Sequence, residues 1–272
     1  MTSPAVTKLR RTTGALFLGG ALLFAGAATV LSSTFDWPDI LREPASVVLP
    51  AYVDGGTGLV WTWFATAWTY AVLAVPILLL PTVLGRRSDA ALRVATVLGA
   101  TSVLLSLIGF LRWVFVVPQL AHSYVAGDAT TRAAVAAAWT AQHQYGGALL
   151  GEHLSQLLAI AWSVTVSLVI VRERILPRWL GLAGLAVSAL YLLNQGDILA
   201  TAVPGFPVFD LAGLLGSSGW GLWVAAFGVT LLVRPVLPGT TSLTDRADPA
   251  DAVDVPSPRT PTSVPPAAAP RS

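Results

Sequence analysis

The chain has 272 residues, of which 54% are hydrophobic and 11% charged, with a formal net charge of +2. A soluble domain carries about 25% charged residues, so this composition excludes a soluble globular protein. The chain contains no cysteine, which excludes disulfides, thiolate metal sites and a cysteine nucleophile. Its basic residues stand at the ends of apolar runs and form no patch that suits a nucleic acid, so the expected partner is the lipid bilayer.

Six apolar runs approach the roughly 20 residues that a helix needs to cross a bilayer core. They predict an all-α membrane protein in which six transmembrane helices form a bundle, with both termini in the cytoplasm. We expect spans at residues 13–31, 57–84, 94–117, 148–171, 179–203 and 211–233, within a transmembrane domain of residues 13–234. Residues 1–12 then form a cytoplasmic N-terminus. The Arg-over-Lys bias, with abundant Ala, Val and Gly, suggests a high-GC bacterial genome, so we expect the spans to lie in a bacterial plasma membrane.

The first run follows three basic residues, which favour a cytoplasmic N-terminus. An alternative interpretation exists, because a basic start, an apolar run and then Ala25-Gly26-Ala27 resemble a cleavable signal peptide. Apolar residues continue through Leu31, so we expect an uncleaved first span. Cleavage would leave the orientation of the later spans unchanged.

Residues 32–56 are the first expected outside loop. Asp36 and Asp39 flank Pro38, and an acidic cap with an early proline is typical of a helix start. Trp37 is of a type favoured at the membrane interface. We interpret the segment as an interfacial loop, and the alternative is a lid over an outside-facing site.

Residues 119–145 are the second expected outside loop. Asp128 is placed to cap a short surface helix over residues 131–144. His122 and His143 flank that helix and join the acids and tryptophan of the first loop as outer-loop candidates for a site.

From Pro238 onward the composition shifts to Pro, Ser, Thr, Asp and Ala. Because such a segment lacks the large apolar residues that build a core, we expect residues 235–272 to form a disordered cytoplasmic tail. Pro258-Arg259-Thr260-Pro261 has the P-x-x-P form of a polyproline ligand, so a cytoplasmic partner of the tail is a hypothesis.

The distribution of basic residues supports this topology. Ten that flank the spans fall on the side assigned to the cytoplasm: Lys8, Arg10, Arg11, Arg86, Arg87, Arg93, Arg172, Arg174, Arg178 and Arg234. Only Arg42 and Arg132 flank spans on the outside. Reversing the topology would invert a bias that membrane proteins normally show.

Several polar residues share one depth near the outer surface. At a rise of 1.5 Å per residue, Arg112 lies roughly 28 Å above Arg93, and Glu152 lies about 30 Å above Arg172. The layer comprises Arg112, Glu152, His153, Gln156, Asn194 and Asp197. Because ionisable groups inside a membrane usually pair and face the bundle interior, we expect an ion pair between Arg112 and Glu152.

Three functions remain open for this layer. The favoured one is non-enzymatic, structural or sensory, with the polar residues linking spans three, four and five. The first alternative is a small-solute or proton-coupled transporter that uses Glu152, His153 and Asp197. The second is an outer-face metal-dependent hydrolase, since histidine and carboxylates bind zinc. The spacing matches no established metal motif, so no metal, cofactor or catalytic residue is predicted.

Three segments resemble a known class of membrane protein. They are FDWPDIL at residues 35–41, RWVFVVP at 112–118 and GEHL at 151–154. They are similar to segments of multi-pass bacterial membrane proteins, actinobacterial in type, that are classed under a domain of unknown function. The resemblance covers about residues 10–235 and implies an integral membrane protein of the cell envelope, without an established activity or catalytic residues.

Overall fold

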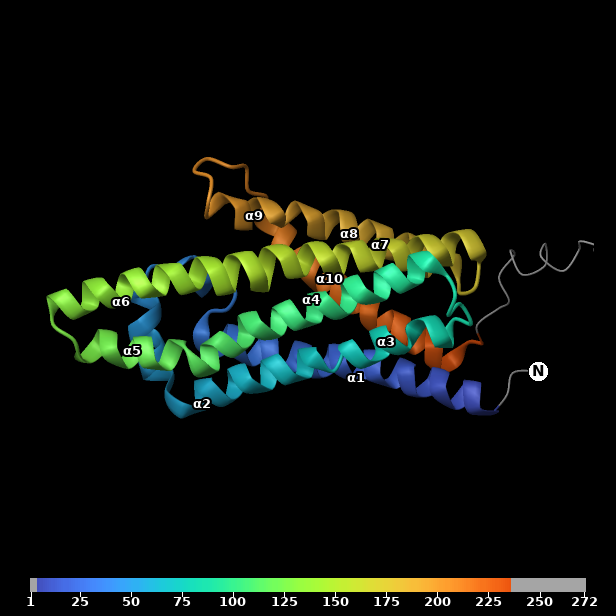
Figure 1. Ribbon diagram of the computed structural model, residues 1–272, viewed down its shortest axis with the longest axis horizontal. Coiled ribbons are helices and arrows are strands. Elements are labelled where there is room, and N and C mark those ends of the chain that lie inside the picture. Colours follow the sequence, from blue (N-terminus) through green and yellow to red (C-terminus); the bar gives the residue numbers. More distant parts are fainter. Residues whose placement is uncertain (1–3, 236–272) are drawn as a thin grey trace, which may run out of the picture. The chain divides into compact units, whose positions relative to one another are not determined.

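The computed structural model describes residues 4–235, which belong to one unit of the chain, Met1–Gly239. Every regular element within those residues is helical, and Figure 1 shows the long helices side by side in a bundle. In chain order the elements are α1 (Pro4–Phe35), η1 (Asp39–Arg42), α2 (Ala45–Ala71), α3 (Ala74–Val83), α4 (Ala90–Phe115), α5 (Val117–Ala126), α6 (Ala129–Gln142), η2 (His143–Leu154), α7 (Ser155–Glu173), α8 (Arg178–Leu193), α9 (Gln195–Ala200) and α10 (Asp210–Val233). The predicted tail lies, apart from its first residue, outside the described residues.

Six helical stretches are long and apolar enough to cross a membrane. They are Pro4–Phe35, Ala45–Val83, Ala90–Ala126, Ala129–Glu173, Arg178–Ala200 and Asp210–Val233. The predicted fold class, an all-α protein with six membrane-spanning helices, is therefore confirmed. Four of the stretches contain more than one element, because the chain bends or changes helix type without leaving the helical path.

The second stretch begins earlier than its apolar run predicted. α2 starts at Ala45, inside the expected outside loop, so much of that loop is helical. Gly56 interrupts the helix with φ 57° and ψ −158°, a conformation that glycine adopts without the steric penalty of a side chain. The residues before Gly56 therefore form a separate helical segment ahead of the predicted span.

The third and fourth stretches are longer than a bilayer core requires. They contain 37 and 45 residues, which corresponds to about 55 and 67 Å against a core of about 30 Å. Much of the surplus lies in α5 and α6, which form a helical hairpin at one end of the bundle (Figure 1). Asp128 caps α6 by accepting a hydrogen bond from the Thr131 amide at 2.8 Å. That bond lowers the pKa of Asp128 below its usual value.

Two clusters of buried side chains fill the bundle. In the aromatic cluster near η1, the rings of Trp63 and Trp113 stack with centroids 4.6 Å apart and planes 3° from parallel. The Tyr52 hydroxyl donates a hydrogen bond to the Trp113 carbonyl. The second cluster includes Phe17 of α1 and Trp162 of α7, with ring centroids 6.1 Å apart. Together they hold both ends of the bundle by close packing.

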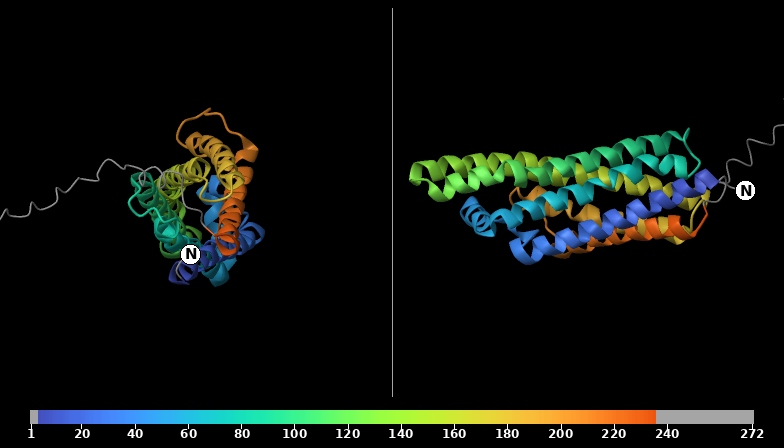
Figure 2. Two further views of the ribbon diagram at one scale, coloured as in Figure 1. Left: turned by 90° about the vertical axis from the view of Figure 1, so that its right-hand side faces the viewer. Right: turned by 90° about the horizontal axis from the view of Figure 1, so that it is seen from below.

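The first helix is an integral part of this bundle. α1 packs along α10 and α2, and the two views of Figure 2 show α1 and α10 side by side. A Cβ atom on Gly14 would lie 2.7 Å from the Gly228 carbonyl oxygen, so the two backbones are in direct contact there. Arg10 donates hydrogen bonds to the carbonyls of Leu231 and Arg234, which satisfies acceptors at the end of α10.

Candidate functional site

One guanidinium group lies between two carboxylates that come from different helices. Arg42, the last residue of η1, places Nη2 at 2.7 Å from Glu152 Oε2 and at 2.7 Å from Asp197 Oδ2. Its Nε donates a further hydrogen bond to the same Asp197 oxygen at 3.0 Å. Because Glu152 belongs to η2 and Asp197 to α9, a single side chain connects three separate elements.

The neighbours of Arg42 in the sequence hold it in place. Ile40 and Leu41 are only 6% and 8% exposed, so they anchor η1 to the bundle. Burial disfavours the charged guanidinium, but Glu152 and Asp197 more than offset this effect and raise the pKa of Arg42 above its ordinary value. Arg42 is therefore a permanent cation at the partly exposed edge of the bundle.

A chain of amide hydrogen bonds continues beside this ion cluster. Gln195 Nε2 and Asn194 Nδ2 donate to Gln156 Oε1 at 2.9 and 3.1 Å. His153 Nδ1 lies 2.6 Å from Gln195 Oε1. Because that amide oxygen can only accept, the hydrogen bonds assign a proton to Nδ1 of His153. We call the following seven residues the polar network: Arg42, Glu152, His153, Gln156, Asn194, Gln195 and Asp197.

One buried oxygen of the polar network has no hydrogen-bond partner. Glu152 Oε2 binds Arg42, whereas Glu152 Oε1 is buried and has no hydrogen-bond partner within residues 4–235. An unsatisfied buried polar atom is unfavourable by about 1–3 kcal/mol. This oxygen therefore remains available to accept a hydrogen bond from a small donor.

The acid and the histidine of the network lie in η2, which is a π-helix, a rare form that is frequent at functional sites. Glycines let this helix approach its neighbours closely. A Cβ atom on Gly151 would lie 2.8 Å from Cα of Gly109 in α4, and one on Gly147 would lie 2.5 Å from Nη2 of Arg112. The missing side chains therefore allow η2 to lie directly on α4.

The predicted ion pair between Arg112 and Glu152 is wrong, because the structure pairs Glu152 with Arg42. Arg112 is 6% exposed, and its Nε donates to the Gly109 carbonyl at 3.1 Å. Its guanidinium carbon lies 5.0 Å from the ring centroid of Trp113, within range of a cation–π contact. Arg112 thus faces the aromatic cluster, and no salt bridge or hydrogen bond within residues 4–235 joins it to the polar network.

The outer-loop candidates do not converge on one site. Asp36 and Asp39 are exposed, while Trp37 packs at the edge of the aromatic cluster. His122 is exposed on α5. His143 is buried, with Nδ1 3.4 Å from Nη1 of Arg112 and its ring stacked on a tryptophan. The structure therefore brings Glu152 together with four other residues of the predicted layer: His153, Gln156, Asn194 and Asp197. None of the five outer-loop candidates joins them.

Two members of the polar network were absent from the sequence-based candidates. Arg42 lies outside every apolar run, and Gln195 is adjacent to the predicted Asn194. A signal for Arg42 did exist. The predicted layer contained two acids, Glu152 and Asp197, but only one base, so charge balance required a second cation from outside the spans.

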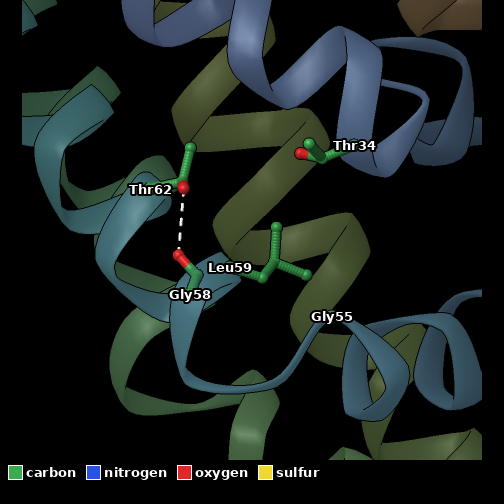
Figure 3. A pocket seen from close by; sticks show the side chains of 5 residues that line it. All are labelled: Thr34, Gly55, Gly58, Leu59 and Thr62. Carbon is green, nitrogen blue, oxygen red and sulfur yellow. Dashed lines mark hydrogen bonds between the residues drawn. The ribbon is translucent and has the colours of Figure 1, made fainter.

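The pockets in the surface are lined by residues outside the polar network. One of about 270 Å³ is lined by Thr34 of α1 together with Gly55, Gly58, Leu59 and Thr62 of α2 (Figure 3). The Thr62 hydroxyl already donates to the Gly58 carbonyl at 2.9 Å. In the part of the chain that the structure describes, no three His, Cys, Asp or Glu side chains come together as a metal site would require.

Comparison with known proteins places the chain in a family. Residues 12–228 match the family described as Domain of unknown function (DUF4386). No curated protein and no solved structure matches the chain. The family match covers far more than half of the sequence and agrees with the apolar multi-helix bundle. This multi-span membrane protein therefore belongs to the DUF4386 family.

Proposed function

We propose that the protein is a non-enzymatic component of the bacterial plasma membrane, structural or sensory in role, in which the polar network fixes how the helices are arranged. The observation that carries this proposal is the contact of Arg42 with both Glu152 and Asp197 at 2.7 Å. Groups that a catalyst would present to a substrate are here used to bind one another.

A structural role follows from the elements that contribute residues to the polar network. The network joins a loop element, a π-helix and the short helix α9, so it connects three elements that are far apart in the sequence. A sensory role fits the same geometry, since Arg42 is 28% exposed and Asp197 37% exposed. An event at this surface that displaced Arg42 would release η1 from both helices at once.

A double-mutant cycle tests the proposal. We expect Arg42→Gln and Glu152→Gln each to destabilise the protein, and the double variant to lose less than the sum of the two. The expected coupling energy is about 2 kcal/mol, as for hydrogen bonds between charged groups. The measurement is reversible unfolding in mixed detergent micelles. Glu43→Gln, at an exposed acid next to Arg42, is the control and is expected to be silent.

Additive effects in that cycle would refute a structural role for the ion cluster. So would a Glu43→Gln variant that loses as much stability as Glu152→Gln. Asp197→Asn provides a second cycle with Arg42→Gln, and it is expected to show a smaller coupling because Asp197 is more exposed than Glu152.

The alternative function is a proton-coupled or small-solute transporter that uses Glu152, His153 and Asp197. The unpaired Glu152 Oε1 supports this alternative, because an unpaired buried oxygen is available to bind a solute in transit. In liposomes loaded with a pH-sensitive dye, a transporter would give a flux that Glu152→Gln abolishes. Absence of flux together with loss of stability in the same variant would favour the structural or sensory role.

An outer-face metal-dependent hydrolase is the least supported of the three functions. The group of ligands that it needs is absent from residues 4–235. Metal analysis of the purified protein tests it directly, because a stoichiometric metal that is lost in His153→Ala would require an assay for hydrolase activity.

A further inference from the structure

The two ends of the bundle carry opposite charge within residues 4–235. The end at which α1 begins has ten basic residues and two acids, Asp89 and Glu173, which gives a formal charge of 10 − 2 = +8. The other end has three basic residues and eight acids, which gives 3 − 8 = −5. The acids of that second end are Asp36, Asp39, Glu43, Asp54, Asp128, Glu152, Asp197 and Asp210. The positive end is therefore suited to an anionic partner.

Three of its arginines lie at the junction of α7 and α8, which we call the α7–α8 turn (residues 172–178): Arg172 is in the last turn of α7, Arg174 follows that helix, and Arg178 is the first residue of α8. Arg172, Arg174 and Arg178 are all exposed. Between them, Ile175 and Leu176 are 0% and 3% exposed, so they anchor the turn to the core and leave the arginines at the surface. Arg174 ends α7 in a left-handed conformation with φ 53°, which turns the chain sharply at this point.

The acid within this turn is bound to another element. Glu173 Oε2 lies 2.8 Å from Nη2 of Arg86, in the turn between α3 and α4. The other salt bridges within residues 4–235 involve Arg42 at the opposite end. The three arginines of the turn thus have no carboxylate partner in the part of the chain that the structure describes.

An exposed apolar strip begins directly after the turn. Trp179, Leu182, Leu190 and Leu193 are 54%, 50%, 41% and 45% exposed. With Ala186, their positions recur every three or four residues, so they lie on one face of α8. Tryptophan is favoured at the level of the lipid headgroups. Arginines followed by a tryptophan and then leucines match the order of headgroup, interface and acyl chains.

We infer that the turn between α7 and α8 is a binding site for an anionic phospholipid, with its phosphate held by Arg172, Arg174 and Arg178. Guanidinium groups bind phosphate oxygens through paired hydrogen bonds. The N-terminus of α8 has no side-chain cap at Pro177, so backbone amides there add donors for the same phosphate. The strip on α8 provides a surface for the acyl chains, which a soluble phosphate would not use.

The experiment measures lipid binding by the purified full-length protein. Phosphatidylglycerol is titrated in neutral detergent and compared with phosphatidylcholine, and bound lipid is counted by native mass spectrometry. The test variant neutralises the three arginines of the turn: R172Q, R174Q and R178Q. The matched control removes the same charge from exposed arginines elsewhere at the positive end: R11Q, R87Q and R93Q.

We expect the test variant to bind phosphatidylglycerol about a hundredfold more weakly, on the order of fivefold for each arginine, because each loses a charge-assisted hydrogen bond to the phosphate. The control variant is expected to change the affinity by less than about threefold, because exposed charges that do not contact the phosphate are largely screened by salt. Equal losses in the two variants would show diffuse attraction to the whole positive end and would overturn the proposal. Unchanged binding in the test variant would overturn it as well.

Two further measurements distinguish lipid binding from misfolding of the variants and from binding of a soluble anion. The wild-type protein must bind phosphatidylglycerol more tightly than phosphatidylcholine, whatever the variants do, and equal affinities refute the site. Inorganic phosphate is titrated in parallel. If inorganic phosphate displaces the lipid when the two are present at equal concentration, the site is one for soluble phosphate and the assignment to a lipid is wrong.

Discussion

Gly147 offers a direct test of how η2 packs on Arg112. A Cβ atom at this position would lie 2.5 Å from Nη2 and 2.7 Å from Cζ of Arg112. The guanidinium cannot simply move aside, because its Nε is bonded to Gly109 and its carbon lies over the ring of Trp113. Gly147→Ala therefore forces a rearrangement of a buried cation.

The magnitude follows from two opposing effects. Overpacking of a filled interior is unfavourable by about 1–3 kcal/mol. Replacing glycine by alanine in a helix is favourable by up to about 1 kcal/mol, because alanine loses less backbone entropy on folding. The net expectation for Gly147→Ala is a loss of about 1–2 kcal/mol of unfolding free energy.

The assay is reversible unfolding in mixed micelles, with Gly26→Ala as the matched control. A Cβ atom on Gly26, which lies in α1, meets nothing within 4 Å, so this control is expected to be neutral or slightly stabilising. In an Arg112→Gln background the penalty of Gly147→Ala should disappear. If Gly147→Ala is as well tolerated as Gly26→Ala, the close contact between η2 and Arg112 is not as described.

Two further predictions concern the aromatic cluster and the α5–α6 hairpin. Trp113→Ala should lower the unfolding free energy by about 3–5 kcal/mol, whereas Trp61→Ala, at a side chain 64% exposed, should have little effect; similar losses would mean that the Trp63–Trp113 stack is not central. Asp128→Ala should speed hydrogen exchange at the Thr131 amide by removing the cap of α6. Because the pKa of Asp128 is lowered in the folded protein, its stabilising contribution is present above the ordinary aspartate pKa and is lost as the pH falls through the folded pKa. Wild type and Asp128→Ala should therefore converge on acidification, and exchange that stays different at low pH would contradict this account.

Hydropathy predicted the six spans because crossing a bilayer demands a run of apolar residues. It could not predict where the helices end in water, since an exposed helix and an exposed loop have the same polarity. The α5–α6 hairpin shows this limit. Only the capping position of Asp128 indicated that a helix followed there, and nothing indicated that residues 45–55 are helical.

Counting residues along a span also predicted the depth of the polar layer but not the direction of its side chains. Arg112 and Glu152 have similar computed heights, yet Arg112 faces Trp113 while Glu152 faces Arg42. The direction of a side chain depends on its angular position around the helix. The π-helix η2 changes that angle, and no sequence pattern predicted a π-helix. Arg42 lies outside the spans, so a scale of depth could not include it.

The π-helix also sets the rotation between the two halves of the fourth stretch. Before η2, Trp139 packs in the aromatic cluster, and after it, Trp162 and Ile170 pack in the second cluster. One residue more or less in a helix turns everything beyond it by about 100°. The number of residues in η2 is therefore constrained independently of their identity. A substitution in η2 acts on the contacts of its own side chain, whereas a single insertion or deletion would turn one of the two clusters out of the interior.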